Sequence, residues 1–244
     1  MKQKDNLLVI IPARGGSKRI PKKNIKTILG QPMIYWPLKE LSKEFKPENI
    51  LISTDDKNII TLVEKIGLNV PFLRPKNLSD DFTGTIPVIN HALEWYENNI
   101  KKVDFVVIVY PTALFLKMND LKKAIKMLKS NKENELVMSA TDFPSPIQRG
   151  IYLDKFGFAK MFYPYNYDIR SQDLKPAYYD AGQFYVWRSE SIRQSKTLVN
   201  SKAQLLKINR NFVIDIDTTE DVEIAKNKLK LFKLDKFDKS WKFT

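Results

Sequence analysis

Short runs of apolar residues alternate with amphipathic segments along the first half of the chain. Runs typical of buried strands occupy residues 7–11, 49–53, 70–72, 103–109 and 135–140. Helical periodicity predicts helices over 32–43, 55–66, 86–97 and 119–130. This alternation predicts an α/β fold with a single doubly wound, mostly parallel, Rossmann-like sheet. Such a sheet binds ligands in the crevice at the carboxyl ends of its strands.

The pattern breaks near residue 143. Residues 143–182 are rich in aromatic side chains and have no clear period, so we expect an excursion from the sheet. Clustered aromatic residues mark interfaces, so the excursion either packs on a partner subunit or forms a small core of its own, and the pattern leaves both open. Strands are expected to return at 184–187, 204–208 and 212–214, followed by a helix capped near Thr218. The chain 1–244 is then one domain.

Composition removes several classes of function. The chain has no cysteine and one histidine, His91, which excludes disulfide frameworks, thiolate metal sites, zinc hydrolases and His-Asp triads. Any metal must be held by oxygen atoms, which favours Mg²⁺ on carboxylates and substrate phosphates. The apolar run at 7–12 is too short for a signal peptide, and no run reaches the ~18 apolar residues of a membrane span. We expect a cytoplasmic protein without a membrane partner.

The formal net charge of +13 first indicates a nucleic-acid partner. The lysines, however, recur throughout the chain beside Asp, Glu or Asn, which is typical of solvated helix faces. We therefore expect no nucleic-acid partner, and a non-catalytic basic module that binds nucleic acid stays as a remote alternative. A smaller share of the charge is expected to attract anionic small substrates.

The segment with the clearest chemistry follows the first predicted strand and reads IPARGGSKRIPKKN, residues 11–24. Two adjacent glycines allow backbone N–H groups to surround an anion, and five cations crowd the same loop. The loop matches neither GxxxxGK[ST] nor GxGxxG, which disfavours a P-loop ATPase and a nicotinamide dehydrogenase. It predicts a phosphate site at the mouth of the sheet.

This segment resembles the first motif of the CMP-sialate synthetase family, cytidylyltransferases that activate nonulosonic and related acids. Three further segments resemble family motifs in the same order: residues 74–85, Tyr110-Pro111-Thr112, and Asp215-Ile216-Asp217-Thr218. The resemblance runs from about residue 7 to 230. Residues 170–174 and 179–185 resemble the branch that uses pseudaminic acid more than the sialate branch, which usually has glutamine where Tyr110 stands.

The resemblance implies attack of a sugar-acid hydroxyl on the α-phosphorus of CTP, with release of pyrophosphate. The sugar expected is pseudaminic acid, with legionaminate, sialate or 3-deoxy-octulosonate as alternatives. Matching the motifs assigns Arg14 and the Gly15, Gly16 and Ser17 amides to the β- and γ-phosphates, and Lys23 to the α-phosphate. The full nucleotide set is Ala13, Arg14, Gly15, Gly16, Ser17, Lys23, Asn24, Arg74 and Thr85, of which Asn24, the Arg74 backbone and Thr85 face cytosine or ribose.

Two acidic residues at positions i and i+2 share one face of an extended strand end, so Asp215 and Asp217 can hold one Mg²⁺. Asp217 can also cap the last helix, a role compatible with metal binding. Asp217 joins Arg14 and Lys23 in the expected catalytic set, and the proton acceptor stays open between Asp217, hydroxide held by the metal, and water.

The expected sugar-binding residues are Tyr110, Arg170, Gln183 and Tyr185, because a guanidinium suits a carboxylate and an amide suits an acetamido group. Packing near a dimer seam is the alternative for the last three. The family resemblance also implies a homodimer.

Overall fold

The computed structural model describes residues 6–200, 202–234 and 241–243. Six strands form its main sheet: β1 (Leu7–Pro12), β4 (Ile50–Ser53), β5 (Phe105–Val109), β6 (Leu136–Asp142), β9 (Tyr178–Arg188) and β10 (Ala203–Lys207). Their spatial order is β10-β6-β9-β5-β1-β4. β9 runs antiparallel to both of its neighbours, and the other paired strands are parallel. The expected mostly parallel α/β sheet is therefore confirmed, with one antiparallel strand inside it.

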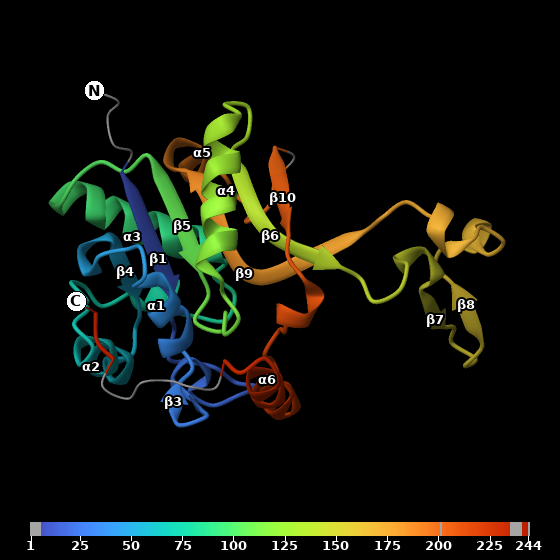
Figure 1. The fold of residues 1–244 in the computed structure, drawn as a ribbon, viewed down its shortest axis with the longest axis horizontal. Coiled ribbons are helices and arrows are strands. Elements are labelled where there is room, and N and C mark those ends of the chain that lie inside the picture. The colour runs from blue at the N-terminus through green and yellow to red at the C-terminus, as the bar shows by residue number, and fades with distance from the viewer. Residues whose placement is uncertain (1–5, 201, 235–240, 244) are drawn as a thin grey trace.

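Helices cover both faces of this sheet (Figure 1). Successive side chains of a strand point to opposite faces, so Val9 and Ile11 pack on one side while Leu8 and Ile10 pack on the other. The first side is covered by α1 (Tyr35–Leu41), α2 (Lys57–Glu64) and α4 (Met118–Ser130). The second is covered by α3 (Thr85–Asn99) and α5 (Ser189–Gln194). The last helix, α6 (Thr219–Leu231), packs on the segment that follows β1.

The local chemistry explains where the sequence patterns were correct. Asp56 caps α2 by accepting a hydrogen bond from the Asn58 amide at 2.7 Å. Thr218 caps α6 in a reciprocal capping box with Asp221. These caps satisfy backbone donors that a helix leaves unpaired at its first turn, which is why both predicted starts hold.

Three predicted elements are wrong in type or position. Pro32 pairs with Thr27 in a short hairpin of β2 (Thr27–Ile28) and β3 (Gln31–Pro32), and α1 begins later, at Tyr35. Pro37 then falls in the first turn of α1, where the missing N–H is not needed. Residues 70–72 form no strand, because Pro71 cannot donate to a ladder. Residues 212–214 form no strand either, since the Asn209 side chain caps a 3-10 turn over Arg210–Phe212.

Residues 143–177, which we call the arm, leave the sheet after β6 and return at β9. The arm holds a small hairpin of β7 (Ile151–Leu153) and β8 (Ala159–Met161) and stands well away from the body of the protein (Figure 1). Residues 178–182 of the predicted excursion belong instead to β9. Large apolar side chains of the arm face solvent, with Leu153, Phe156 and Tyr165 71%, 72% and 76% exposed.

Within the described ranges, no helix combines the length and the apolar character that crossing a lipid bilayer requires.

Candidate active site

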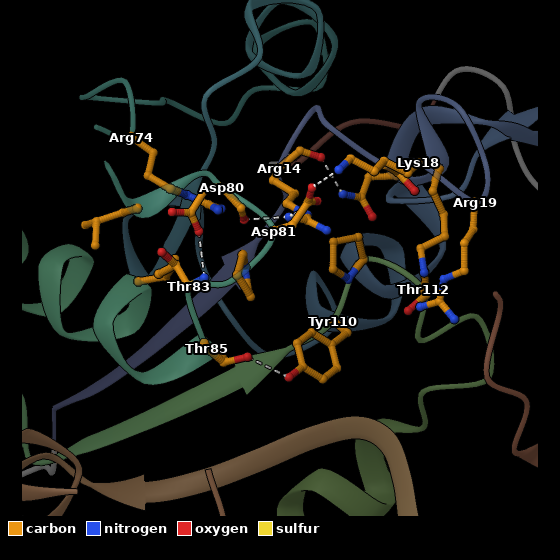
Figure 2. Close-up of a pocket in the computed structure, with 18 of the residues that line it drawn as sticks. Arg14, Lys18, Arg19, Arg74, Asp80, Asp81, Thr83, Thr85, Tyr110 and Thr112 are labelled. Carbon is orange, nitrogen blue, oxygen red and sulfur yellow. Dashed lines mark hydrogen bonds and ion pairs between the residues drawn. The ribbon is translucent and has the colours of Figure 1, made fainter. Parts of the chain in front are cut away.

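A cleft of about 550 Å³ opens at the carboxyl edge of the sheet. Its walls come from the loop after β1, the segment before α3, the turn after β5, and Asp215 ahead of α6. Figure 2 shows these side chains converging on one space. Predicted site residues that line the cleft are Arg14, Ser17, Lys23, Asn24, Arg74, Thr85, Tyr110 and Asp215.

The first glycine of the basic loop is required by close packing. A Cβ on Gly15 would lie 2.7 Å from the Cβ of Asp56, and the Gly15 amide donates to Asp55 Oδ1 at 2.8 Å. Gly16 has open space around the corresponding position. Gly15 therefore holds the loop against the start of α2, whereas Gly16 does not.

The amides of this loop are partly engaged by the protein itself. The Ala13 amide donates to the Ser53 carbonyl at 2.9 Å, and the Ser17 amide donates to the Gly15 carbonyl at 3.1 Å. Of the three amides assigned to the phosphates, those of Gly15 and Ser17 therefore already have acceptors. Phosphate contacts through them would require those bonds to be exchanged.

Four of the five cations of the loop pair with two carboxylates, those of Asp81 and Asp217. Arg14 Nη1 lies 3.1 Å from an Asp81 oxygen and donates to the Asp80 carbonyl at 2.6 Å, and Lys18 pairs with the other Asp81 oxygen. On the opposite side, Arg19 lies 2.6 Å and Lys23 3.3 Å from the two oxygens of Asp217. Lys23 also donates to the Ile216 carbonyl at 2.7 Å. The sequence pattern did not assign roles to Lys18, Arg19, Asp80 or Asp81.

Asn24 and Arg74 are buried at the floor of the cleft. The Asn24 amide donates to the Arg14 carbonyl at 2.9 Å, which fixes the basic loop from within. The Arg74 guanidinium donates to the side chain and the carbonyl of Ser53, and its backbone N–H donates to the Thr54 carbonyl at 2.7 Å. Burial lowers the pKa of Arg74 to about 10, and nearby Arg14 adds to the effect, while Asp55 opposes it.

The wall beside β5 is a chain of hydroxyl groups. Thr85 Oγ1 lies 3.0 Å from Tyr110 Oη, and the ring of Tyr110 contacts that of Tyr185 edge to face at 5.7 Å between centroids (Figure 2 shows the first pair). The Tyr185 hydroxyl donates to Asp180. Burial raises the pKa of both tyrosines, so both hydroxyls stay protonated and act as donors at neutral pH.

Among the predicted sugar residues, Tyr110 lines the cleft and the other three do not. Tyr185 is buried behind Tyr110, and Gln183 is buried with its amide donating to the Phe212 carbonyl at 2.5 Å. Arg170 lies on the arm and donates to Asp173 at 2.7 Å. In this structure the side chains of Gln183 and Tyr185 are buried and bond to other residues of the chain, and neither lines the cleft.

Two carboxylates stand where the sequence predicts a metal site. Asp215 faces the cleft, and partial burial of its carboxyl together with the charge of Asp217 raises its pKa despite nearby Lys23 and Arg19. Thr218 rather than Asp217 is the cap of α6, so the Asp217 carboxylate is not used in capping. No group of three acidic or histidine ligands gathers in the described ranges. Two carboxylates with substrate phosphate oxygens nevertheless suit Mg²⁺, which keeps several ligands from substrate and water.

The single histidine lies outside this constellation. His91 packs edge-on against Phe72, with ring centroids 5.0 Å apart, and does not line the cleft.

Comparison with known proteins shows which family the chain matches and which solved structures share its fold. Residues 8–148 match the protein family described as cytidylyltransferase. The chain is 39% identical to a pseudaminic acid cytidylyltransferase of Campylobacter jejuni, over 90% of this chain and 94% of that protein. It is 27% identical to a CMP-N,N'-diacetyllegionaminic acid synthase of Legionella pneumophila, over 92% and 97% of the two chains.

A solved structure of CMP:2-keto-3-deoxy-manno-octonic acid synthetase complexed with CTP has the same fold. It aligns with a TM-score of 0.66 at 14% identity and covers 93% of this chain and 100% of its own. A 4-diphosphocytidyl-2C-methyl-D-erythritol synthase from Anaerococcus prevotii aligns with a TM-score of 0.62 at 16% identity, over 93% and 99% of the two chains.

Proposed function

The chain belongs to the cytidylyltransferase family, and we propose that it transfers CMP from CTP to a nonulosonic acid, with pseudaminic acid as the sugar. The observation that carries the proposal is the cleft itself. Four cations from one loop, Arg14, Lys18, Arg19 and Lys23, surround a space that also receives Asp215. This arrangement suits a polyphosphate with its metal ion, and the similarity to the Campylobacter enzyme supplies the sugar.

The reaction joins two anions that repel each other. The sugar hydroxyl oxygen bonds to the α-phosphorus, the bond from that phosphorus to the bridging oxygen breaks, and pyrophosphate leaves. Two unit charges 4 Å apart interact by ~4 kcal/mol at an effective dielectric constant of ~20, so a few fixed cations offset much of the repulsion. In the proposal Arg14 and Lys18 contact the β- and γ-phosphates, and Lys23 contacts the α-phosphate, where negative charge develops.

Asp215 and Asp217 are the residues that would hold Mg²⁺ in the proposal. The ion would supply neutralisation of phosphate charge when bound. In the described structure both oxygens of Asp217 face Arg19 and Lys23. We infer that incoming phosphates take over these two cations and thereby free Asp217 for the metal. The hydroxyl proton then leaves to Asp217 or to water.

The buried wall of the cleft would orient the other reaction partners. Asn24, the Arg74 backbone and Thr85 stand on the side proposed for cytidine. The Tyr110 hydroxyl, placed by Thr85 and backed by the ring of Tyr185, is proposed to donate to the sugar acid. A tyrosine here, where the sialate branch has glutamine, would change the shape of the sugar pocket.

Pyrophosphate release tests the proposal directly. The purified protein is incubated with CTP and Mg²⁺ against a panel of pseudaminic, legionaminic, sialic and 3-deoxy-octulosonic acids, with ATP, GTP and UTP as nucleotide controls. Release with CTP and pseudaminic acid is expected. Release with another acid alone would change the assigned sugar substrate, and no pyrophosphate release with any acid would overturn the proposed reaction.

We also propose that the arm joins two copies of the chain. Several large apolar side chains of one short hairpin face solvent, Phe156 at 72% and Phe158 at 67% exposure, which is more than a monomer usually leaves uncovered. Light scattering after gel filtration should give the mass of a dimer. Phe156→Ser should shift the protein towards monomer, whereas Phe82→Ser, which removes a 96% exposed phenylalanine outside the arm, should not. A monomeric parent protein would overturn the dimer.

A further inference from the structure

The Asp81 carboxylate bridges two cations at the edge of the cleft. Its two oxygens face different cations, with Oδ1 3.1 Å from Arg14 Nη1 and Oδ2 paired with Lys18 (Figure 2 shows the Lys18 pair). Both cations come from the loop after β1, while Asp81 comes from the segment before α3. A carboxylate that bridges two cations in this way uses the same donors as a phosphate group.

The segment around Asp81 is built to present this carboxylate. The neighbouring Asp80 side chain accepts hydrogen bonds from the Phe82 and Thr83 amides at 3.0 and 2.6 Å, which closes a tight turn. The Asp80 carbonyl also accepts from Arg14 at 2.6 Å. Lys18 has an 84% exposed side chain and forms an ion pair with Asp81. Hydrogen bonding by Lys18 holds the pKa of Asp81 below its ordinary range, with the charges of Lys18 and Arg14 adding to the effect, so the carboxylate is charged at neutral pH.

We propose that Asp81 is an internal competitor of the β- and γ-phosphates for Arg14 and Lys18, and that it promotes the release of pyrophosphate. The inference rests on the proposed function, which assigns these two cations to the leaving group. CTP displaces Asp81 because cytidine contacts and the α-phosphate add to its binding. After transfer, pyrophosphate no longer carries the α-phosphate and cytidine, so it binds less tightly than CTP and Asp81 displaces it more readily.

The same arrangement predicts which ligands are affected. CTP and pyrophosphate both require Arg14 and Lys18, so both must displace Asp81. CMP places its one phosphate at Lys23, which contacts Asp217 and not Asp81. Neutralising Asp81 should therefore tighten the binding of pyrophosphate and CTP and leave that of CMP unchanged.

Calorimetric titration of Asp81→Asn with pyrophosphate, CTP and CMP tests the inference. We expect pyrophosphate to bind at least about fivefold more tightly than to the parent protein, and CMP to bind within about twofold. Pyrophosphate should also become a stronger product inhibitor, and the KM for CTP should fall. A gain in affinity cannot arise from damage to the fold, and Asp81→Ser provides a second variant without the charge.

Asp80→Asn is the matched control, because it removes one charge at the next residue while its side-chain oxygen can still accept in the turn. It should tighten pyrophosphate by less than twofold, and the gain from Asp81→Asn should shrink in a Lys18→Ala background. Equal gains for the two aspartate variants, or no gain for Asp81→Asn, would overturn the inference. If the inference is overturned but the parent protein still turns over CTP, the proposed function stands. A parent protein that binds neither CTP nor pyrophosphate would overturn the inference and the proposed function together.

Discussion

Replacing Gly15 by alanine should displace the basic loop that follows β1, while the same change at Gly16 should not. The two glycines are adjacent, and neither has a positive φ angle, so backbone strain does not separate them. They differ in surroundings. A Cβ at Gly15 would lie 2.7 Å from both Cβ and Oδ2 of Asp56, whereas nothing lies within 4 Å of a Cβ at Gly16.

The size of the effect follows from two contributions. Forcing an extra methyl into a packed site costs about 1–3 kcal/mol, and losing the Gly15 hydrogen bond to the charged Asp55 removes about 1.5–3 kcal/mol. The two overlap, because moving the loop relieves the clash as it breaks the bond. We expect a loss of roughly 2–4 kcal/mol, which lowers the melting temperature by about 2–4 °C per kcal/mol for a chain of this size. Gly16→Ala should stay within about 0.5 kcal/mol.

Thermal unfolding and pyrophosphate release measure the two consequences. Arg14 follows Ala13 directly at the exit of β1, so a shift of the loop by about 1 Å should reduce turnover by about 100-fold in Gly15→Ala. If Gly15→Ala melts and turns over like Gly16→Ala, the packing of Gly15 against Asp56 does not position the loop and the reasoning fails.

Three further outcomes follow from described contacts. Lys23→Ala should lower kcat by about 100- to 1000-fold with unchanged circular dichroism, because it removes the proposed donor to the α-phosphate; normal turnover would exclude that role. Gln183→Leu should lower stability by about 0.5–1.5 kcal/mol, since the partly buried Phe212 carbonyl loses its donor, and leave the KM for the sugar acid unchanged, as kinetics and unfolding can establish. Burial alone would raise the pKa of Glu97, but Arg193 and the other donors hold it below the ordinary 4.5. Its charge therefore stabilises the fold above that pH, so Glu97→Gln should melt a few degrees lower at pH 7, and the difference should vanish as the pH falls through the lowered pKa.

Local signals predicted much of the fold. The alternating apolar strands, the face of α3 and the cap of α6 depend on residues close in sequence, and all three are confirmed. The strands predicted at residues 70–72 and 212–214 are absent, because the apolar side chains there pack without their backbone pairing to a strand. Pro71 and the capping residue Asn209 are the local signals that distinguish these two segments from real strands.

The site was predictable to the extent that strand ends determine it. The exits of β1 and β5 bring the basic loop and Tyr110 to one cleft, as the sheet topology requires. The pairing of Arg14 with Asp81 was not predictable, because it depends on the path of a turn far away in the sequence. The inward placement of Gln183 was not predictable either. The register of β9 against β6 shifts between Met138 and Ala140, so alternation alone does not say which side chains face the cleft.

The arm enters and leaves the sheet at one point. Asp142 at the end of β6 and Tyr178 at the start of β9 are direct cross-strand partners, and such pairs have their Cα atoms about 5 Å apart. The arm is thus a long replacement for a hairpin turn, and the sheet does not depend on its length or content. Relatives could exchange this insertion for one with a different surface, and an engineer could graft another in its place, while the nucleotide chemistry on the far side of β9 is retained. The surface proposed for dimerisation and the cleft proposed for nucleotide binding therefore lie on separate parts of the chain.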